Sequence, residues 1–189
     1  MPRKIPHIQQ KKLVFIAGEG LSERGYGRWL NHHAAEIGLS ISIRVEALAG
    51  GDPCDLVEQS IEKLAAAEKS GARYRSRALL LDSDLRGMNI DRDQRAINLS
   101  ARKNLNLIWQ EPCHEGFLLR HFDAVNQLRP ATVNRAEQLL ARVWPQYEKG
   151  MDATKYKSVL SSDHLERARN EIPALNDFLR SIGWGRRGR

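Results

Sequence analysis

The stretch Leu13-Val14-Phe15-Ile16-Ala17-Gly18-Glu19-Gly20 decides the fold of this chain. Its apolar run is short and ends in glycine and a charge, which is typical of a buried strand in a parallel sheet. A second short apolar run, 78–81, ends in Asp82 and Asp84. Because ligands of open α/β sheets bind at the carboxyl ends of the strands, we expect these acidic residues to meet at one edge of a sheet.

Strands and helices alternate along the rest of the predicted core. We expect strands at 13–17, 39–47, 78–81 and 105–109. The helices expected between and after them are 23–37 with Ser22 as its cap, 54–69 with Asp52 as its cap, 91–103 and 114–122. This order predicts an α/β fold with a parallel-type sheet flanked by helices.

The second part of the chain has a helical pattern. Helices are expected at 132–143, around Tyr156, and at 163–182 with a kink at Pro173. We therefore divide the chain into a polar N-terminal segment 1–12, an α/β core 13–129 and a helical C-terminal extension 130–189 with a basic tail.

Composition limits the class of protein. The 189 residues carry a formal net charge of +7, which favours a polyanionic partner, nucleic acid first. No apolar run has the length of a membrane span and the N-terminus lacks a signal-peptide core, so we expect a cytoplasmic protein. The basic clusters are the linker arginines Arg73, Arg75 and Arg77, then Arg86, Arg92 and Arg95, and the tail Arg186, Arg187 and Arg189.

The acidic residues at the predicted strand ends suit a divalent cation. Carboxylate oxygens are the ligands that Mg²⁺ prefers, and Mn²⁺ accepts the same set. Asp82 and Asp84 converge if extended geometry continues past the strand, and Glu19 would face them as a metal ligand or as a general acid/base. Glu23 could reach back to the same edge, and Glu115 could either join the site or cap its own helix. An isolated Asp-x-Asp is equally typical of a turn.

Several longer segments resemble a known family. They include Phe15 to Gly20, Gly51-Asp52-Pro53 with Leu56-Val57, and Leu81-Asp82-Ser83-Asp84. The most specific is Glu111-Pro112-Cys113-His114-Glu115-Gly116-Phe117-Leu118-Leu119-Arg120-His121-Phe122. Together they resemble the RloB-like family of bacterial abortive-infection and restriction-associated proteins, which has a Toprim-like fold. His114 and Gly116 depart from that family, in which larger apolar residues are usual.

This resemblance implies a Toprim-like, Mg²⁺-dependent nuclease that acts on RNA, with tRNA as one candidate, or on DNA, in phage defence. Glu19 would match the motif glutamate, and Asp82 and Asp84 the metal-binding aspartates. Lys157 falls near a position where the family tends to carry a lysine. The resemblance is also compatible with a partner protein that is encoded in the same defence operon.

Other residues have less specific readings. Arg86, Arg92 and Lys157 are candidate phosphate contacts, and each is also compatible with a solvated surface. His121 is interpreted as a packed or surface histidine rather than a general base, since it lies six residues from Glu115 and on another helical face. Cys54 and Cys113 lack metal-ligand spacing and are expected to be free and buried.

Two other functions are compatible with the sequence. One is a non-catalytic nucleic-acid-binding or regulatory subunit of a defence system that keeps a Toprim-like core. The other is a phosphoacceptor receiver domain, which also gathers acids at strand ends. The receiver ranks last, because its pattern needs a lysine after a later strand and no lysine follows the fourth strand here.

Overall fold

A computed structural model describes residues 10–185 of the chain. Most of the expected polar segment 1–12, and the tail arginines Arg186, Arg187 and Arg189, lie outside the described residues.

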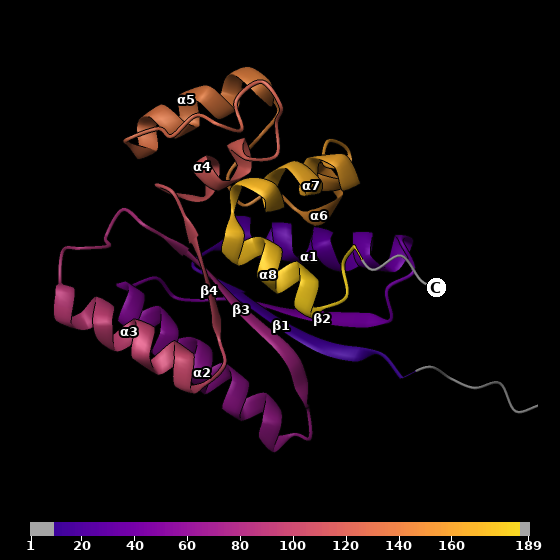
Figure 1. The fold of residues 1–189 in the computed structure, drawn as a ribbon, viewed down its shortest axis with the longest axis vertical. Coiled ribbons are helices and arrows are strands. Elements are labelled where there is room, and N and C mark those ends of the chain that lie inside the picture. Colours follow the sequence, from indigo (N-terminus) through magenta and orange to yellow (C-terminus); the bar gives the residue numbers. More distant parts are fainter. Residues whose placement is uncertain (1–9, 186–189) are drawn as a thin grey trace, which may run out of the picture.

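A four-stranded, fully parallel sheet forms the centre of the described chain (Figure 1). Its strands, in the spatial order β2-β1-β3-β4, are β2 (Ile41–Ala47), β1 (Lys12–Gly18), β3 (Tyr74–Asp82) and β4 (Asn106–Gln110). The prediction of an α/β fold with a parallel sheet flanked by helices is therefore confirmed.

The helices follow the predicted order. They are α1 (Leu21–Glu36), α2 (Pro53–Lys69), α3 (Ile90–Arg102), α4 (His114–Leu119), α5 (Val133–Val143), α6 (Ala153–Lys157), α7 (Ser162–Glu171) and α8 (Pro173–Ser181). None of the helices within residues 10–185 has both the length and the apolarity needed to cross a membrane.

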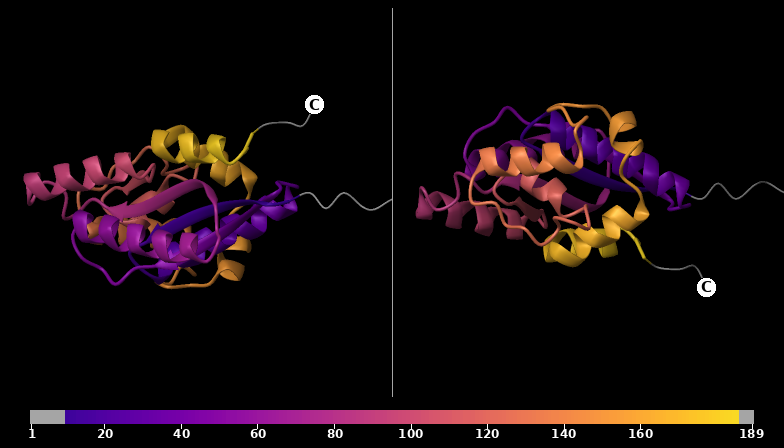
Figure 2. Two further views of the ribbon diagram at one scale, coloured as in Figure 1. Left: turned by 90° about the horizontal axis from the view of Figure 1, so that it is seen from below. Right: turned by 90° about the horizontal axis from the view of Figure 1, so that it is seen from above.

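The alternation of side chains along the strands creates two hydrophobic cores. On β1, Val14 and Ile16 pack on the side of α1, whereas Phe15 and Ala17 pack on the side of α2. The contacts of α1 and α8 with the strands lie on the first side, and those of α2 and α3 on the second, so the molecule has three layers (Figure 2).

The C-terminal helices share their core with the sheet. Trp144, Tyr156 and Phe178 belong to the same hydrophobic cluster as Ile16 and Leu80. Helix α8 contacts β3 and β4, while α4 and α5 lie above the sheet in the first view (Figure 1). The expected boundary between a core and an extension at residue 130 stays a prediction.

Strand β3 is longer than predicted. The sequence indicated a basic linker over 70–77, but β3 already begins at Tyr74, so Arg75 and Arg77 belong to the strand. Pairing of β3 with β1 provides the hydrogen bonds that compensate for the polar composition of this segment. The Arg77 guanidinium also donates to Glu68 Oε1 at 2.5 Å, which holds the strand against the end of α2.

The predicted helix 163–182 consists of two helices. Ile172 has φ −123° and ψ 93°, which is outside the helical region, and α8 begins at Pro173. A proline disfavours helical backbone at the preceding residue and is well suited to the first position of a helix. The expected kink is therefore a complete break between α7 and α8.

Glycine allows α1 to pack closely against a loop from the C-terminal part of the chain. A Cβ added at Gly25 would lie 2.1 Å from the Met151 carbonyl oxygen and 2.9 Å from Tyr156 Cε2. A Cβ at Gly27 would lie 2.8 Å from a Val45 methyl group. The first clash is with backbone and the second with a side chain.

We predict that Gly25→Ala destabilises the protein by about 1–3 kcal/mol through overpacking. In a helix with free space at that position, the same change stabilises by about 1 kcal/mol. The sign of the change in the free energy of unfolding therefore shows whether Gly25 is crowded. Gly27→Ala should cost less, because a side chain can move where a backbone carbonyl cannot. Urea unfolding of both variants measures this, and a Gly25→Ala protein as stable as the wild type would contradict the packing.

Candidate active site

Residues that end the parallel strands meet on the α1 side of the sheet. The two-residue period puts Gly18 of β1, Asp82 of β3 and Gln110 of β4 on the same face as Ile16 and Leu80. Asp82 and Gln110 are direct partners in the β3–β4 register. Because α1 and α4 begin just after β1 and β4, their first turns lie at this edge too.

Glu23 is held at this edge by the two glycines of the first motif. A Cβ at Gly18 would lie 2.2 Å from Glu23 Cβ, so only glycine lets the first turn of α1 come this close to β1. The Gly20 N–H donates to Glu23 Oε2 at 3.0 Å, and the Glu23 side chain is buried. Gly20, rather than the predicted Ser22, is the N-cap of α1.

Ser22 has a different role from the predicted one. Its Oγ accepts a hydrogen bond from the Gly150 N–H at 2.8 Å, which ties the start of α1 to the loop before α6. Glu23, at the third helical position, accepts a hydrogen bond from the N–H of Gly20. The spacing from Gly20 to Glu23 was the sequence signal for this capping glutamate.

Glu19 lies next to the loop that follows β2. The ideal Cβ position of Gly50 is 4.0 Å from Glu19 Oε1, and Gly50 has φ +78°. Partial burial raises the pKa of Glu19, and the charges of Glu23 and Asp84 raise it further. Glu23 and Asp84 are therefore close enough to Glu19 to act on its carboxylate.

Asp82 is the acid on which the others converge. Burial first, and then the charges of Glu23, Glu19, Asp84 and Glu115, raise the pKa of Asp82 to about 8. Glu19, Asp84 and Glu115, which the sequence predicted for the site, are thus close enough to act on Asp82, together with Glu23. We call these five residues the acidic cluster.

Asp84 joins the acidic cluster from a turn, whereas the sequence predicted extended backbone at this position. Extended backbone ends at Asp82, and Asp84 lies in an exposed turn. The Ser83 N–H donates to the carbonyl oxygens of Gln110 and Pro112, each at 3.0 Å, and this turns the chain away from the strand direction. The strand pleat therefore does not set the relation of Asp82 to Asp84.

Glu115 lies in the first turn of α4 and is buried. Burial by itself raises the pKa of Glu115, but hydrogen bonds, including those from the Cys113 thiol and the Tyr147 hydroxyl, lower it below its usual value. The Tyr147 hydroxyl donates to Glu115 Oε1 at 3.0 Å. Glu115 is therefore an ionised carboxylate that already has partners within the protein.

Gln110 was missed in the sequence and lies at the centre of the acidic cluster. With its amide turned so that every atom has a complementary partner, Nε2 donates to Glu23 Oε1 at 3.1 Å and to Asp82 Oδ1 at 2.9 Å. Its Oε1 then accepts from His114 Nδ1 at 2.7 Å. The sequence signal was a polar residue directly after the apolar run Leu107-Ile108-Trp109 of this strand.

The donor set of the acidic cluster suits a divalent cation. Within residues 10–185, no three His, Cys, Asp or Glu side chains already stand in the arrangement of a metal site. The ligand types are nevertheless carboxylates, and burial together with the neighbouring acidic charges raises the pKa of Asp82. A bound cation would relieve that repulsion.

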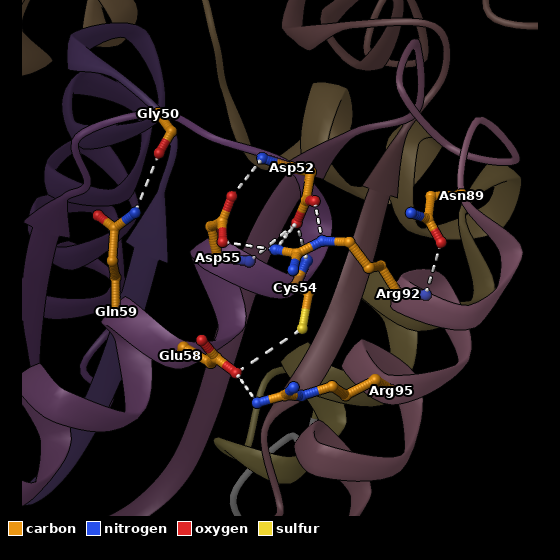
Figure 3. Close-up of polar contacts among 9 residues, drawn as sticks. All are labelled: Gly50, Asp52, Cys54, Asp55, Glu58, Gln59, Asn89, Arg92 and Arg95. Atoms are coloured by element: carbon orange, nitrogen blue, oxygen red, sulfur yellow. Dashed lines mark hydrogen bonds and ion pairs between the residues drawn. The ribbon is translucent and has the colours of Figure 1, made fainter.

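The three predicted phosphate contacts have different surroundings. Arg86 follows the Asp84 turn, and its guanidinium carbon lies 4.7 Å from the centre of the Trp109 ring. Arg92 pairs instead with Asp52 and Asp55 at the start of α2, where it joins α3 to α2 (Figure 3). Asp52 caps α2 as the sequence predicted.

Lys157 is not brought to the acidic cluster. Its Nζ pairs with Glu36 near the C-terminal end of α1, thirteen residues beyond Glu23. At 1.5 Å per residue this separates Glu36 from Glu23 by about 20 Å along the helix. Of the three predicted phosphate contacts, Arg86 is the one next to an acidic residue of the cluster in the chain.

Histidine and cysteine residues behave as the sequence indicated. His121 is fully buried, forms a 3.0 Å hydrogen bond with the Tyr26 hydroxyl, and has its pKa lowered to about 3, mainly by burial. Cys54 and Cys113 are free and buried. Trp109, on the edge strand β4, is only partly buried.

Comparison with known proteins gives a family. The protein-family model described as RloB-like protein matches residues 14–178. The chain belongs to the RloB-like family. That match includes all five residues of the acidic cluster and extends into α8. No curated protein and no solved structure matches the chain.

The raised pKa of Asp82 predicts a pH dependence of stability in the presence of a chelator. The folded-state pKa is about 8, above the usual value of 3.8 for this group, so the folded state holds this proton more tightly than the unfolded state. Stability should therefore fall as the pH rises from about 4 to about 8. Asp82→Asn should remove this fall and stabilise the protein at pH 8 by about 1–3 kcal/mol.

Urea unfolding at pH 5 and pH 8 measures this effect. Asp177→Asn is the matched control. Asp177 is exposed on α8 and lies beside Arg75 and Asn106, near the starts of β3 and β4 and thus at the other end of the strands. An Asp82→Asn protein with the same pH dependence as the wild type would show that the acidic cluster does not strain Asp82.

Proposed function

We propose that this member of the RloB-like family is a Toprim-like, metal-dependent nuclease that hydrolyses phosphodiester bonds in nucleic acid. The observation that carries the proposal is the acidic cluster, in which residues from the ends of β1 and β3 and from the starts of α1 and α4 lie at one edge of a parallel sheet. Nuclease sites of this kind need several carboxylates around divalent cations.

Three residues of the acidic cluster are available to a metal. Asp82, Asp84 and Glu19 would hold Mg²⁺ or Mn²⁺, since each is at least partly exposed, whereas Glu23 and Glu115 are buried and accept hydrogen bonds from Gly20 and Tyr147. When bound, the divalent cation supplies Lewis-acid stabilisation of the charge on the phosphodiester.

The protein groups perform the remaining tasks. Glu19 has a raised pKa and lies beside the Gly50 loop, where its carboxylate would accept a proton from the attacking water. Arg86, on the exposed turn after Asp84, would contact a phosphate of the substrate. The net charge of +7 favours approach of a polyanion despite the acidic edge.

The biological setting of the proposal comes from the family. A role in phage defence, with RNA, tRNA or DNA as the substrate, follows the resemblance described above and fits the RloB-like family match. A partner protein encoded with it in a defence operon belongs to the same proposal.

One observation favours a non-catalytic alternative. Several polar atoms of the acidic cluster are already satisfied by Gly20, Gln110 and Tyr147, and no metal site stands ready-made within residues 10–185. A nucleic-acid-binding or regulatory subunit of a defence system would keep such a cluster for structure alone. Cleavage assays with and without metal separate the two functions.

We predict that Glu19→Gln and Asp82→Asn each lower metal-dependent cleavage of labelled RNA or DNA by at least about 100-fold, because each removes a charge from the proposed cation site. Glu62→Gln, on an exposed face of α2, and Asp177→Asn are the matched controls. Circular dichroism should show that all four proteins are folded. Full activity in either cluster variant would refute the assignment, and binding that survives chelator without cleavage would favour the alternative.

A second prediction concerns the contact made by Arg86. Arg86→Ala should weaken nucleic-acid binding about equally for different sequences and reduce the slope of log affinity against log salt by about one. Lys157→Ala should change the slope less, because Lys157 pairs with Glu36 away from the acidic cluster. Fluorescence anisotropy over a range of salt concentrations measures both slopes, and equal effects of the two variants would remove the distinction between them.

A further inference from the structure

An uncharged side chain lies among the carboxylates of the acidic cluster. Gln110 is fully buried and stands opposite Asp82 in the β3–β4 register. It is the last residue of β4, where the two-residue period turns its side chain toward the acidic cluster rather than toward α3.

The hydrogen bonds of Gln110 fix the orientation of its amide. In one orientation both carboxylates would face the carbonyl oxygen, which is an acceptor and repels them. In the other, Nε2 uses its two N–H groups for Glu23 Oε1 at 3.1 Å and Asp82 Oδ1 at 2.9 Å. Two acidic side chains from different elements are thus joined by one donor group.

His114 determines which way the amide faces. Its Nδ1 lies 2.7 Å from the Gln110 amide and its Nε2 lies 3.0 Å from the Tyr156 hydroxyl. With a proton on Nδ1, the ring donates to Gln110 Oε1, and its Nε2 shares the Tyr156 hydroxyl proton with the Ser22 carbonyl oxygen, which lies 3.2 Å from that hydroxyl. Burial lowers the pKa of His114, in keeping with a neutral ring.

A glutamine is well suited to this place for an electrostatic reason. A lysine or arginine would neutralise the carboxylates and compete with a cation, and another acid would add to their repulsion. The amide offers two donors and no net charge. It therefore holds Glu23 and Asp82 while leaving their attraction for a cation intact.

We propose that Gln110 is the positioning residue of this site: its amide nitrogen fixes Asp82 relative to Glu23, and His114 fixes the direction of that amide. The link to metal binding rests on the proposed function. The hydrogen bonds that join Glu23 and Asp82 through Gln110 do not depend on that function.

The first test is metal binding by the full chain without nucleic acid. Isothermal titration with Mn²⁺ compares the wild type with Gln110→Leu, with His114→Phe and with the control Gln94→Leu on the exposed face of α3. Loss of such an outer-shell partner typically weakens metal binding by about 10- to 100-fold. We expect that loss for Gln110→Leu, a smaller one for His114→Phe, and none for Gln94→Leu.

The second test does not need a metal. In chelator, Gln110→Leu should lower the urea midpoint of the wild type but lower it much less in a Glu23→Gln/Asp82→Asn background, where the carboxylates that need the donor are gone. If Gln110→Leu does not fold alone, His114→Phe is compared in the same two backgrounds.

The outcomes separate the two proposals. If the wild type binds Mn²⁺ and Gln110→Leu binds it equally tightly, the positioning role is wrong and the metal site stands. If the wild type binds no Mn²⁺, the metal-dependent function fails, and the urea experiment alone decides the positioning role. Equal shifts of the urea midpoint in both backgrounds would overturn it.

Discussion

Repulsion among carboxylates at one edge of a parallel sheet is the constraint around which this site is built. Five acidic residues lie close enough that Asp82 has its pKa raised to about 8. The protein tolerates this because hydrogen bonds from the Gly20 N–H, the Tyr147 hydroxyl and the Gln110 amide hold three of the carboxylates in place. Strain of this kind is commonly found at functional sites, where stability is lower than it could be.

The C-terminal helices complete the site rather than extending from it. Tyr147, before α6, donates to Glu115, and Tyr156 in α6 supports the ring of His114. Gly25 lets α1 approach the loop that carries Met151, so the start of α1 and the C-terminal part of the chain are packed as one unit. A change in α6 should therefore affect the side chains of the acidic cluster at the ends of the strands.

Much of the fold could be predicted because its signals are local. The apolar runs before Glu19 and Asp82 gave two strands, and the alternation over 39–47 gave a third. The predictions that were wrong concern long-range interactions. Pairing with β1 extends β3 to Tyr74, and hydrogen bonds to β4 and Pro112 turn the chain between Asp82 and Asp84.

The sequence by itself determined the α/β order, the parallel sheet and the position of Glu19 and Asp82 at strand ends, because strand ends follow from hydrophobic periodicity. Only the tertiary structure decided that Gln110 joins Glu23 to Asp82. These residues are far apart in the chain, and no local pattern records which side chains become neighbours once three elements pack together. The placement of Lys157 beside Glu36, rather than near the acids, was decided in the same way by the packing of α6 on α1.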